Sequence, residues 1–397
     1  MSGNTSVGGS VGGSVGGALG GSLGGSVGGS VGRSVGGAVG RSSGGAAGRA
    51  MGAALGLAVG DATGWPAARH RSHLHAPWSR RLHRELDTFA EEHGVTSLPV
   101  PFALNQPTEP LALGPSDDAE WLAWTILTID QPRAEAFRGL IGAPIRARIS
   151  VTTALGNLAR GLEPPASGHD NPHFFDDAAA VRAVAFGIAG RAPRPGTAHT
   201  AYDDRGTPRG TPRGTGRGVT RDPVRDAGRD AEVTNAGDGV LAARAMAGAV
   251  AAVVETGRIA DALDAALAEL PDDTAIGHNA RQALAIAAKA GDPFAAVPAL
   301  DAALLDHVYS YGVAAALTVP VALALASAGP LERAVPAAAC LASLADSAPA
   351  LTGALTGAVA GYHAIPEGWA RAARTLTGCC LPDLAGRDLM ELVEGIA

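Results

Sequence analysis

The sequence has few of the residues that usually mark nucleic-acid binding, disulfide bonding or redox chemistry. Of its 397 residues only Lys289 is a lysine, and the net charge at pH 7 is −7. This mild negative charge argues against nucleic acid as a partner, because proteins that bind it usually carry a basic patch that neutralises phosphates. The three cysteines, Cys340, Cys379 and Cys380, form no C-x-x-C pattern. We therefore expect a reduced, cytoplasmic protein without a zinc or redox cysteine motif.

Aromatic residues and uninterrupted hydrophobic runs are also scarce. Phe, Trp and Tyr make up 4% of the chain, and the apolar segments consist mainly of Ala, Leu and Val. Such segments, without β-branched runs bounded by turns, predict helices and an all-α fold. Residues 311–328 are apolar, but Pro320 interrupts them and no anchoring charges flank them. We therefore predict buried helices there and no membrane partner.

Two segments rich in glycine or proline are predicted to lie outside the core. Residues 1–47 are an almost pure Ser-Val-Gly-Gly repeat, which buries too little apolar surface to compensate for its conformational entropy. Residues 191–230 contain the run GTPRGTPRG, which interrupts helix and strand alike. The remainder is long enough for one domain with a large core. The sequence thus predicts a disordered tail over 1–47 and one domain over 48–397, with a disordered insertion at about 191–230.

One short motif points to metal chemistry. Ser116, Asp117 and Asp118 precede an apolar segment that is predicted to be helical. A hydroxyl and two adjacent carboxylates supply the hard oxygen ligands that Mg²⁺ prefers. We therefore predict one Mg²⁺ ion held by these three residues. Glu120, two residues further along, is a weak candidate for a general base, and an interaction with the helix dipole explains it at least as well.

Other carboxylates stand beside other predicted helices. Asp61 ends the segment 49–61, in which small residues recur at helical spacing, so that a neighbouring helix can approach closely. Asp176 and Asp177 open the apolar segment 178–188. Acidic residues at the start of a helix also complement its dipole, so a functional and a stabilising role both remain open for this pair.

Three motifs, in this order, resemble the ADP-ribosylglycohydrolase family. They are GLAVGDATG at 56–64, SDDAE at 116–120 and GAVAGYHAIP at 357–366. The resemblance implies an all-α orthogonal helix bundle and hydrolysis of the glycosidic bond that joins ADP-ribose to an acceptor. It also implies two Mg²⁺ ions that bind the ribose hydroxyls in a central cleft. The expected partner is an ADP-ribose-like small molecule or an ADP-ribosylated protein.

The resemblance also assigns roles to individual residues. Ser116, Asp117 and Asp118 stand where the family has a Thr-Asp-Asp ligand set, and serine keeps the hydroxyl. The residues that the resemblance implies for substrate binding, on loops facing the same cleft, are Asp61, Asp176, Asp177, Asn235 and Asp238. Asp177 is also a second weak candidate for a catalytic residue.

The sequence departs from the family pattern at several positions. The family's Asp-x-Asp-Thr run, which supplies further metal ligands, falls on residues 348–351, whose sequence is Ala-Pro-Ala-Leu. Asp346 and Ser347 lie just upstream. The catalytic Glu of the family falls on Ala68, and a His common in a later loop falls on Asn235. A second Mg²⁺ ion would therefore need ligands from elsewhere in the chain, and the candidates are Asp176, Asp177 and Asp238, whose loops should face the same cleft in the family fold.

These features leave three functions open. The first is a hydrolase that acts on a ribosyl glycosidic bond with a partly degenerate Mg²⁺ site. The second is a catalytically inactive member of the family that binds a nucleotide or a partner protein in the old cleft. The third is a different reaction on the same scaffold, for instance on a nucleoside-like metabolite, because a fold does not fix a function.

Overall fold

The computed structural model describes residues 45–64, 114–190, 221–304, 314–341 and 343–396. Within these ranges the regular elements are all helices, and β-pairing is limited to two isolated bridges, Asp176 with Ala314 and Thr375 with Asp388. The predicted all-α fold is therefore confirmed. The chain divides into one unit over residues 1–41 and another over 42–397. Almost all of the predicted tail, and residues 191–220 of the predicted insertion, lie outside the described ranges.

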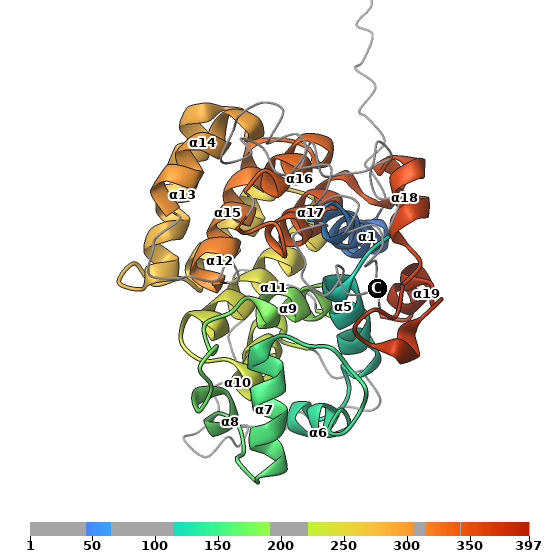
Figure 1. Cartoon of the computed structure of the whole chain (residues 1–397). Coiled ribbons are helices and arrows are strands. Elements are labelled where there is room, and N and C mark those ends of the chain that lie inside the picture. Colours follow the sequence, from blue (N-terminus) through green and yellow to red (C-terminus); the bar gives the residue numbers. More distant parts are fainter. Residues whose placement is uncertain (1–44, 65–113, 191–220, 305–313, 342, 397) are drawn as a thin grey trace, which may run out of the picture. The chain divides into compact units, whose positions relative to one another are not determined.

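The helices follow one another as shown in Figure 1. The first half of the described chain contains α1 (Ala46–Gly64), α5 (Asp117–Leu127), α6 (Arg133–Arg138), α7 (Ile149–Ala159), α8 (Ala166–His169), α9 (Ala178–Ala189), α10 (Pro223–Thr234) and α11 (Asp238–Thr256). The second half contains α12 (Ile259–Ala268), α13 (Ala275–Ala290), α14 (Pro293–Leu304), α15 (Ala315–Ala328), α16 (Leu331–Ala339), α17 (Ala348–Ala360), α18 (Glu367–Ala373) and α19 (Leu389–Glu394), with 3₁₀ turns η1 (Tyr362–Ala364) and η2 (Pro382–Leu384).

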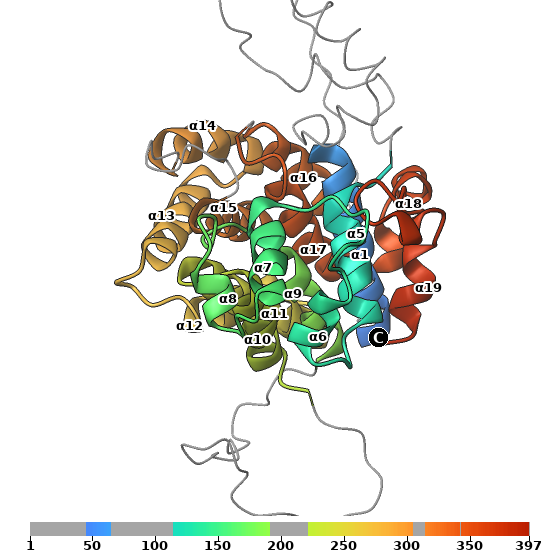
Figure 2. The same cartoon turned by 60° about the horizontal axis from the view of Figure 1, so that its bottom comes forward.

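Helices α1 and α17 pack antiparallel with their backbones in direct contact, as the views in Figure 1 and Figure 2 agree. A Cβ atom on Gly56 would lie 2.0 Å from the carbonyl oxygen of Gly353, and one on Gly52 would lie 2.3 Å from that of Gly357. Only hydrogen fits at these positions. The predicted close approach of a neighbouring helix to α1 is thus confirmed, and it brings Asp61, near the end of α1, beside the start of α17.

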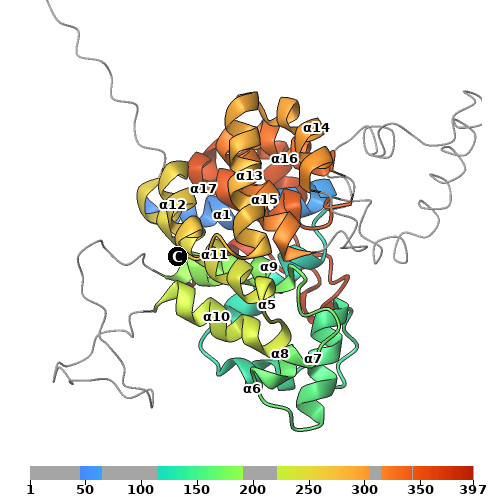
Figure 3. The same ribbon diagram turned by 90° about the vertical axis from the view of Figure 1, so that its left-hand side faces the viewer.

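Helix α11 lies in the interior and packs against α9, α10, α12 and α1 (Figure 3). Its apolar residues are mostly Ala and Val, whose small side chains allow neighbours on several faces. By length and composition α11 would also suffice to cross a membrane, and 67% of that apolar window is buried by the rest of the protein. Within residues 311–328, for which the sequence predicted buried helices, residues 315–328 form α15, which is buried along most of its length, and residues 311–313 lie outside the described ranges.

One boundary and one helix differ from the sequence predictions. The predicted insertion extended to residue 230, whereas α10 already begins at Pro223. Asp222 caps this helix by accepting a hydrogen bond from the Arg225 backbone N–H at 3.2 Å, and proline is well tolerated in the first turn. The sequence analysis predicted no helix over α14, which contains Pro298. The Asp292 side chain accepts from the N–H groups at the start of α14 and supports that helix.

A buried ion-pair network joins α6, α9 and α10. The carboxylate of Asp230 accepts hydrogen bonds from Arg182 Nε at 2.7 Å and from Arg133 Nε at 2.8 Å. Arg182 also donates to the hydroxyl of Thr234 at 2.7 Å. Burial alone would raise the pKa of Asp230, but the two arginines outweigh it and hold this pKa below its usual value. The network therefore stabilises the fold when Asp230 is ionised.

We expect Gly56→Ala to destabilise the protein by about 1–3 kcal/mol or more, because the added methyl group forces the backbones of α1 and α17 apart. Gly48→Ala is the matched control in the same helix. An added Cβ at Gly48 meets no atom within 4 Å, so this change should stabilise by up to about 1 kcal/mol through helix propensity. Urea unfolding of both variants measures the difference. Equal stability of the two variants would contradict the backbone contact.

Asp230→Asn should cost about 3–5 kcal/mol at neutral pH, because it leaves two buried arginines without their counter-charge. Because the pKa of Asp230 is lowered in the folded protein, its contribution is present above the unfolded pKa near 3.8 and is lost as the pH falls through and below that value. Unfolding of the wild type and the variant, followed from neutral pH to about pH 3, should therefore show a narrowing gap. Asp130→Asn, which breaks an exposed pair with Arg221, should change stability by less than about 1 kcal/mol.

Candidate functional site

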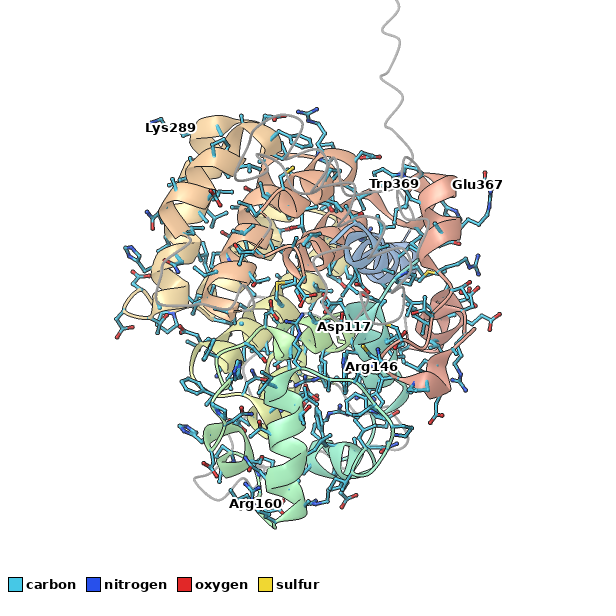
Figure 4. The ribbon with its side chains drawn as sticks, viewed as in Figure 1. Asp117, Arg146, Arg160, Lys289, Glu367 and Trp369 are labelled. Carbon is cyan, nitrogen blue, oxygen red and sulfur yellow. The ribbon has the colours of Figure 1, made fainter. Side chains whose placement is uncertain are left out.

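Four helices begin around one arginine. The residues that precede their first turns are Ser116 for α5, Arg148 for α7, Asp177 for α9 and Ser347 for α17. Helix N-termini carry partial positive charge, which favours nearby carboxylates. Figure 4 shows Asp117 in this region, at the start of α5. The sequence therefore brings acidic residues from distant segments to one place.

Asp61 holds the start of α5 in position. Its carboxylate accepts hydrogen bonds from the Ser116 backbone N–H at 2.6 Å and from the Ala119 N–H at 3.0 Å, and the Ser116 hydroxyl also donates to it. The Ser116 hydroxyl lies 3.3 Å from Asp117 Oδ1. Sequence analysis placed Asp61 in substrate binding, and the structure gives it a capping role that orients Ser116 and Asp117.

The Arg148 guanidinium lies among three carboxylates, which together with it form what we call the Arg148 cluster. Nη1 is 2.9 Å from Asp177 Oδ1, and Nη2 is 3.0 Å from Asp346 Oδ2 and 3.5 Å from Asp118 Oδ1. Nη2 also donates a hydrogen bond to the Ser347 hydroxyl at 2.6 Å. The Arg148 side chain is 10% exposed, so these charges meet largely away from water.

Burial and mutual repulsion shape the electrostatics of the Arg148 cluster. Burial raises the pKa of Asp118 well above its usual value and nearby Asp117 raises it further, while Arg148 counteracts both. Burial likewise raises the pKa of Asp177 to about 7, against the opposing effect of Arg148. Burial alone would lower the pKa of Arg148, but the surrounding carboxylates outweigh it and raise this pKa. The guanidinium is therefore a permanent cation in a region with excess negative charge.

Glu120 points away from this cluster. Its Oε1 accepts from the Cys379 backbone N–H at 2.7 Å and the Thr377 hydroxyl at 3.1 Å. Its Oε2 accepts from the N–H groups of Cys380 at 2.8 Å and Leu381 at 2.7 Å. The side chain is fully buried. This geometry gives Glu120 a structural role, because its carboxylate holds the C-terminal segment against α5. The sequence analysis had named Glu120 as a weak candidate for a general base.

Glu120, Cys379 and Cys380 also bring three ligand atoms within 4.8 Å of one another. Metal binding by cysteine requires the thiolate. Hydrogen bonding between the Cys380 and Cys379 thiols, together with burial, raises the pKa of Cys380, and the oxygens of Glu120 already accept from backbone N–H groups. These three side chains are therefore better described as packing than as a metal site.

The remaining residues predicted to bind substrate are Asp176, Asn235 and Asp238. Asp176 Oδ1 accepts from Asn235 Nδ2 at 2.9 Å, and the Thr234 hydroxyl donates to Asn235 Oδ1 at 2.6 Å. Both Asp176 and Asn235 are buried, so this pair connects the start of α9 to the Asp230 network. Asp238 is half-buried, and its described interaction is with the backbone N–H of Ile276, at the start of α13.

The described residues fit the family's two-ion site poorly. Residues 348–351, where the second ligand run is expected, form the buried, apolar first turn of α17. Among the described residues, no three carboxylates bring their oxygens within 4.8 Å of one another. Ser116 Oγ lies 3.3 Å from Asp117 Oδ1, whereas Asp118 Oδ1 lies 3.5 Å from Arg148 Nη2. The Arg148 guanidinium lies where carboxylates from three helices converge. Ala68, the position of the family's catalytic Glu, lies outside the described ranges.

Sequence analysis did not identify Arg148 as part of the site. It lies in a turn that contains a second arginine, Arg146, two residues earlier, and no motif distinguishes the two. Arg146 is exposed (Figure 4). Asp346 and Ser347 were recognised as the polar residues nearest to the missing ligand run, and the structure places both against Arg148.

Glu120→Gln should destabilise the protein strongly, because the amide NH₂ group would face backbone N–H groups that need an acceptor. Each buried N–H left unpaired costs about 1–3 kcal/mol. Denaturant unfolding measures the loss, with Glu135→Gln on the exposed side of α6 as the control. A Glu120→Gln variant as stable as the control would show that the contacts with residues 379–381 contribute little.

Comparison with known proteins agrees with this architecture. The model of the ADP-ribosylglycohydrolase family matches residues 42–396. A solved structure described as an ADP-ribosylglycohydrolase-related protein complex is similar in fold, with a TM-score of 0.50 and 17% sequence identity, over 88% of this chain and 97% of that one. No curated protein matches the chain significantly. Because the family model covers nearly the whole helical unit, the chain belongs to the ADP-ribosylglycohydrolase family.

Proposed function

We propose that this chain is a catalytically inactive family member that binds an ADP-ribose-like ligand beside the Arg148 cluster. The observation that carries the proposal is that the described carboxylates of the site are already engaged. Asp118 and Asp177 face Arg148, Asp61 caps α5, and Glu120 accepts from backbone N–H groups. Hydrolysis of a glycosidic bond needs a carboxylate that is free to activate water or protonate the leaving group.

The cluster remains suited to ligand binding. Asp346 is 23% exposed, which makes it the most accessible of the three carboxylates around Arg148. A carboxylate beside a guanidinium offers acceptors and donors together, which matches the vicinal hydroxyls of a ribose. One Mg²⁺ ion at Ser116, Asp117 and Asp118 stays a prediction, because those oxygen donors are retained. The cytoplasmic location inferred from the sequence likewise stays a prediction.

Hydrolysis is the second candidate function, and one observation favours it. Burial raises the pKa of Asp177 to about 7, and a general acid or base works best when its pKa lies near the operating pH. The Asp177 side chain is fully buried and lies against Arg148, so it would have to leave Arg148 to reach a substrate. Turnover that is lost in Asp177→Asn would support this candidate.

A ligand screen separates the two functions. ADP-ribose, NAD and AMP are each added to the full chain, and the thermal unfolding midpoint and release of free ADP-ribose from an ADP-ribosylated protein are measured with and without Mg²⁺. We expect a stabilising shift with ADP-ribose and no release. Asp346→Ala should weaken binding about tenfold, the loss expected for a charged hydrogen bond. Asp273→Ala, at an exposed loop carboxylate, is the control. Release of free ADP-ribose by the wild type would favour the hydrolase. If none of the three ligands shifts the unfolding midpoint, the proposed binding is contradicted.

A further inference from the structure

We propose that Arg148 is a tethered cation that replaces one of the two divalent ions of the family. The proposal concerns the ions that the cluster accepts, and it holds whichever ligand or activity the protein has. It starts from an observation of geometry: the guanidinium contacts carboxylates on α5, at the start of α9 and before α17. A metal ion can join separate elements by binding carboxylates from each of them. The guanidinium joins α5, the start of α9 and the turn before α17 in the same way.

The contacts of Arg148 beside the expected second ligand run support the replacement. Asp346 and Ser347 immediately precede residues 348–351, where the sequence pattern expects the second ligand run. Those four residues supply no side-chain oxygen, and Arg148 Nη2 instead reaches Asp346 at 3.0 Å and Ser347 at 2.6 Å. The positive charge that an ion would bring to the start of α17 is thus supplied by the protein.

The cluster places three carboxylates around a single guanidinium. Asp118 Oδ2 and Asp346 Oδ1 are buried oxygens that have no hydrogen-bond partner among the residues that the structure describes. Both belong to carboxylates whose other oxygen faces Arg148. A guanidinium carries one charge and donates along fixed directions, whereas a divalent ion carries two and accepts oxygens from all sides. Replacing the ion by arginine would leave such oxygens unpaired.

Removal of the guanidinium should therefore restore a divalent-ion site. Arg148→Gln keeps a long polar side chain but removes the charge, so that Asp118, Asp177 and Asp346 lose the one cation that pairs with them in the described part of the chain. Mn²⁺ is used as the probe, because its binding can be counted directly by electron paramagnetic resonance. We expect the wild type to bind at most one Mn²⁺ per chain and Arg148→Gln to bind one more. Arg148→Gln/Asp177→Asn should lose the additional ion.

Arg146→Gln is the matched control, since Arg146 lies two residues away and pairs with no described carboxylate. Its Mn²⁺ count should equal that of the wild type. Two Mn²⁺ ions in the wild type, or no gain in a folded Arg148→Gln variant, would overturn the proposal. If Arg148→Gln is unfolded without metal, its recovery of a cooperative thermal transition on addition of Mn²⁺ supports the proposal. Failure to fold at saturating Mn²⁺ counts against it.

Discussion

The structure around the site depends on one electrostatic constraint, the burial of several carboxylates at converging helix N-termini. Each helix start contributes partial positive charge, but only over its first turn. Asp118, Asp177 and Asp346 therefore need a cation, and the Arg148 guanidinium meets this need while largely shielded from water. Burial of an ion pair rarely adds net stability, but these pairs connect the start of α7 with α5, with the start of α9 and with the turn before α17.

Backbone packing decides where that constraint acts. The glycines of α1 and α17 allow the two helices to touch along their backbones, so that the end of α1 is fixed beside the start of α17. Asp61 at this end caps α5 and orients Ser116 and Asp117. Glu120 secures the other side of α5 against residues 379–381. The acidic motif is thus held by contacts from both termini of the described unit, and its geometry is a property of the whole fold.

Membership of the ADP-ribosylglycohydrolase family fixes the scaffold and leaves the chemistry to individual residues. Residues 348–351 illustrate the point, because the same first turn of α17 that would carry oxygen ligands is apolar and packed in the core. The change from ligand to core residue requires that positive charge be supplied in another way or that the neighbouring carboxylates become protonated. Arg148, paired with Asp346 and Asp177, supplies positive charge, and the raised pKa values of Asp118 and Asp177 favour protonation of those two carboxylates as well.

The sequence by itself determined the helical class, the family, the close packing of α1 and the grouping of Ser116, Asp117 and Asp118. These follow from local composition and periodicity, or from motifs that are contiguous in the chain. Only the tertiary structure identified Arg148, because it acts on Asp118, 30 residues away, and on Ser347, 199 residues away. It likewise decided that Glu120 is structural, since its partners lie about 260 positions further along. The sequence determines which side chains are charged. The fold determines which of these charges lie close together, because it brings the ends of particular helices into contact.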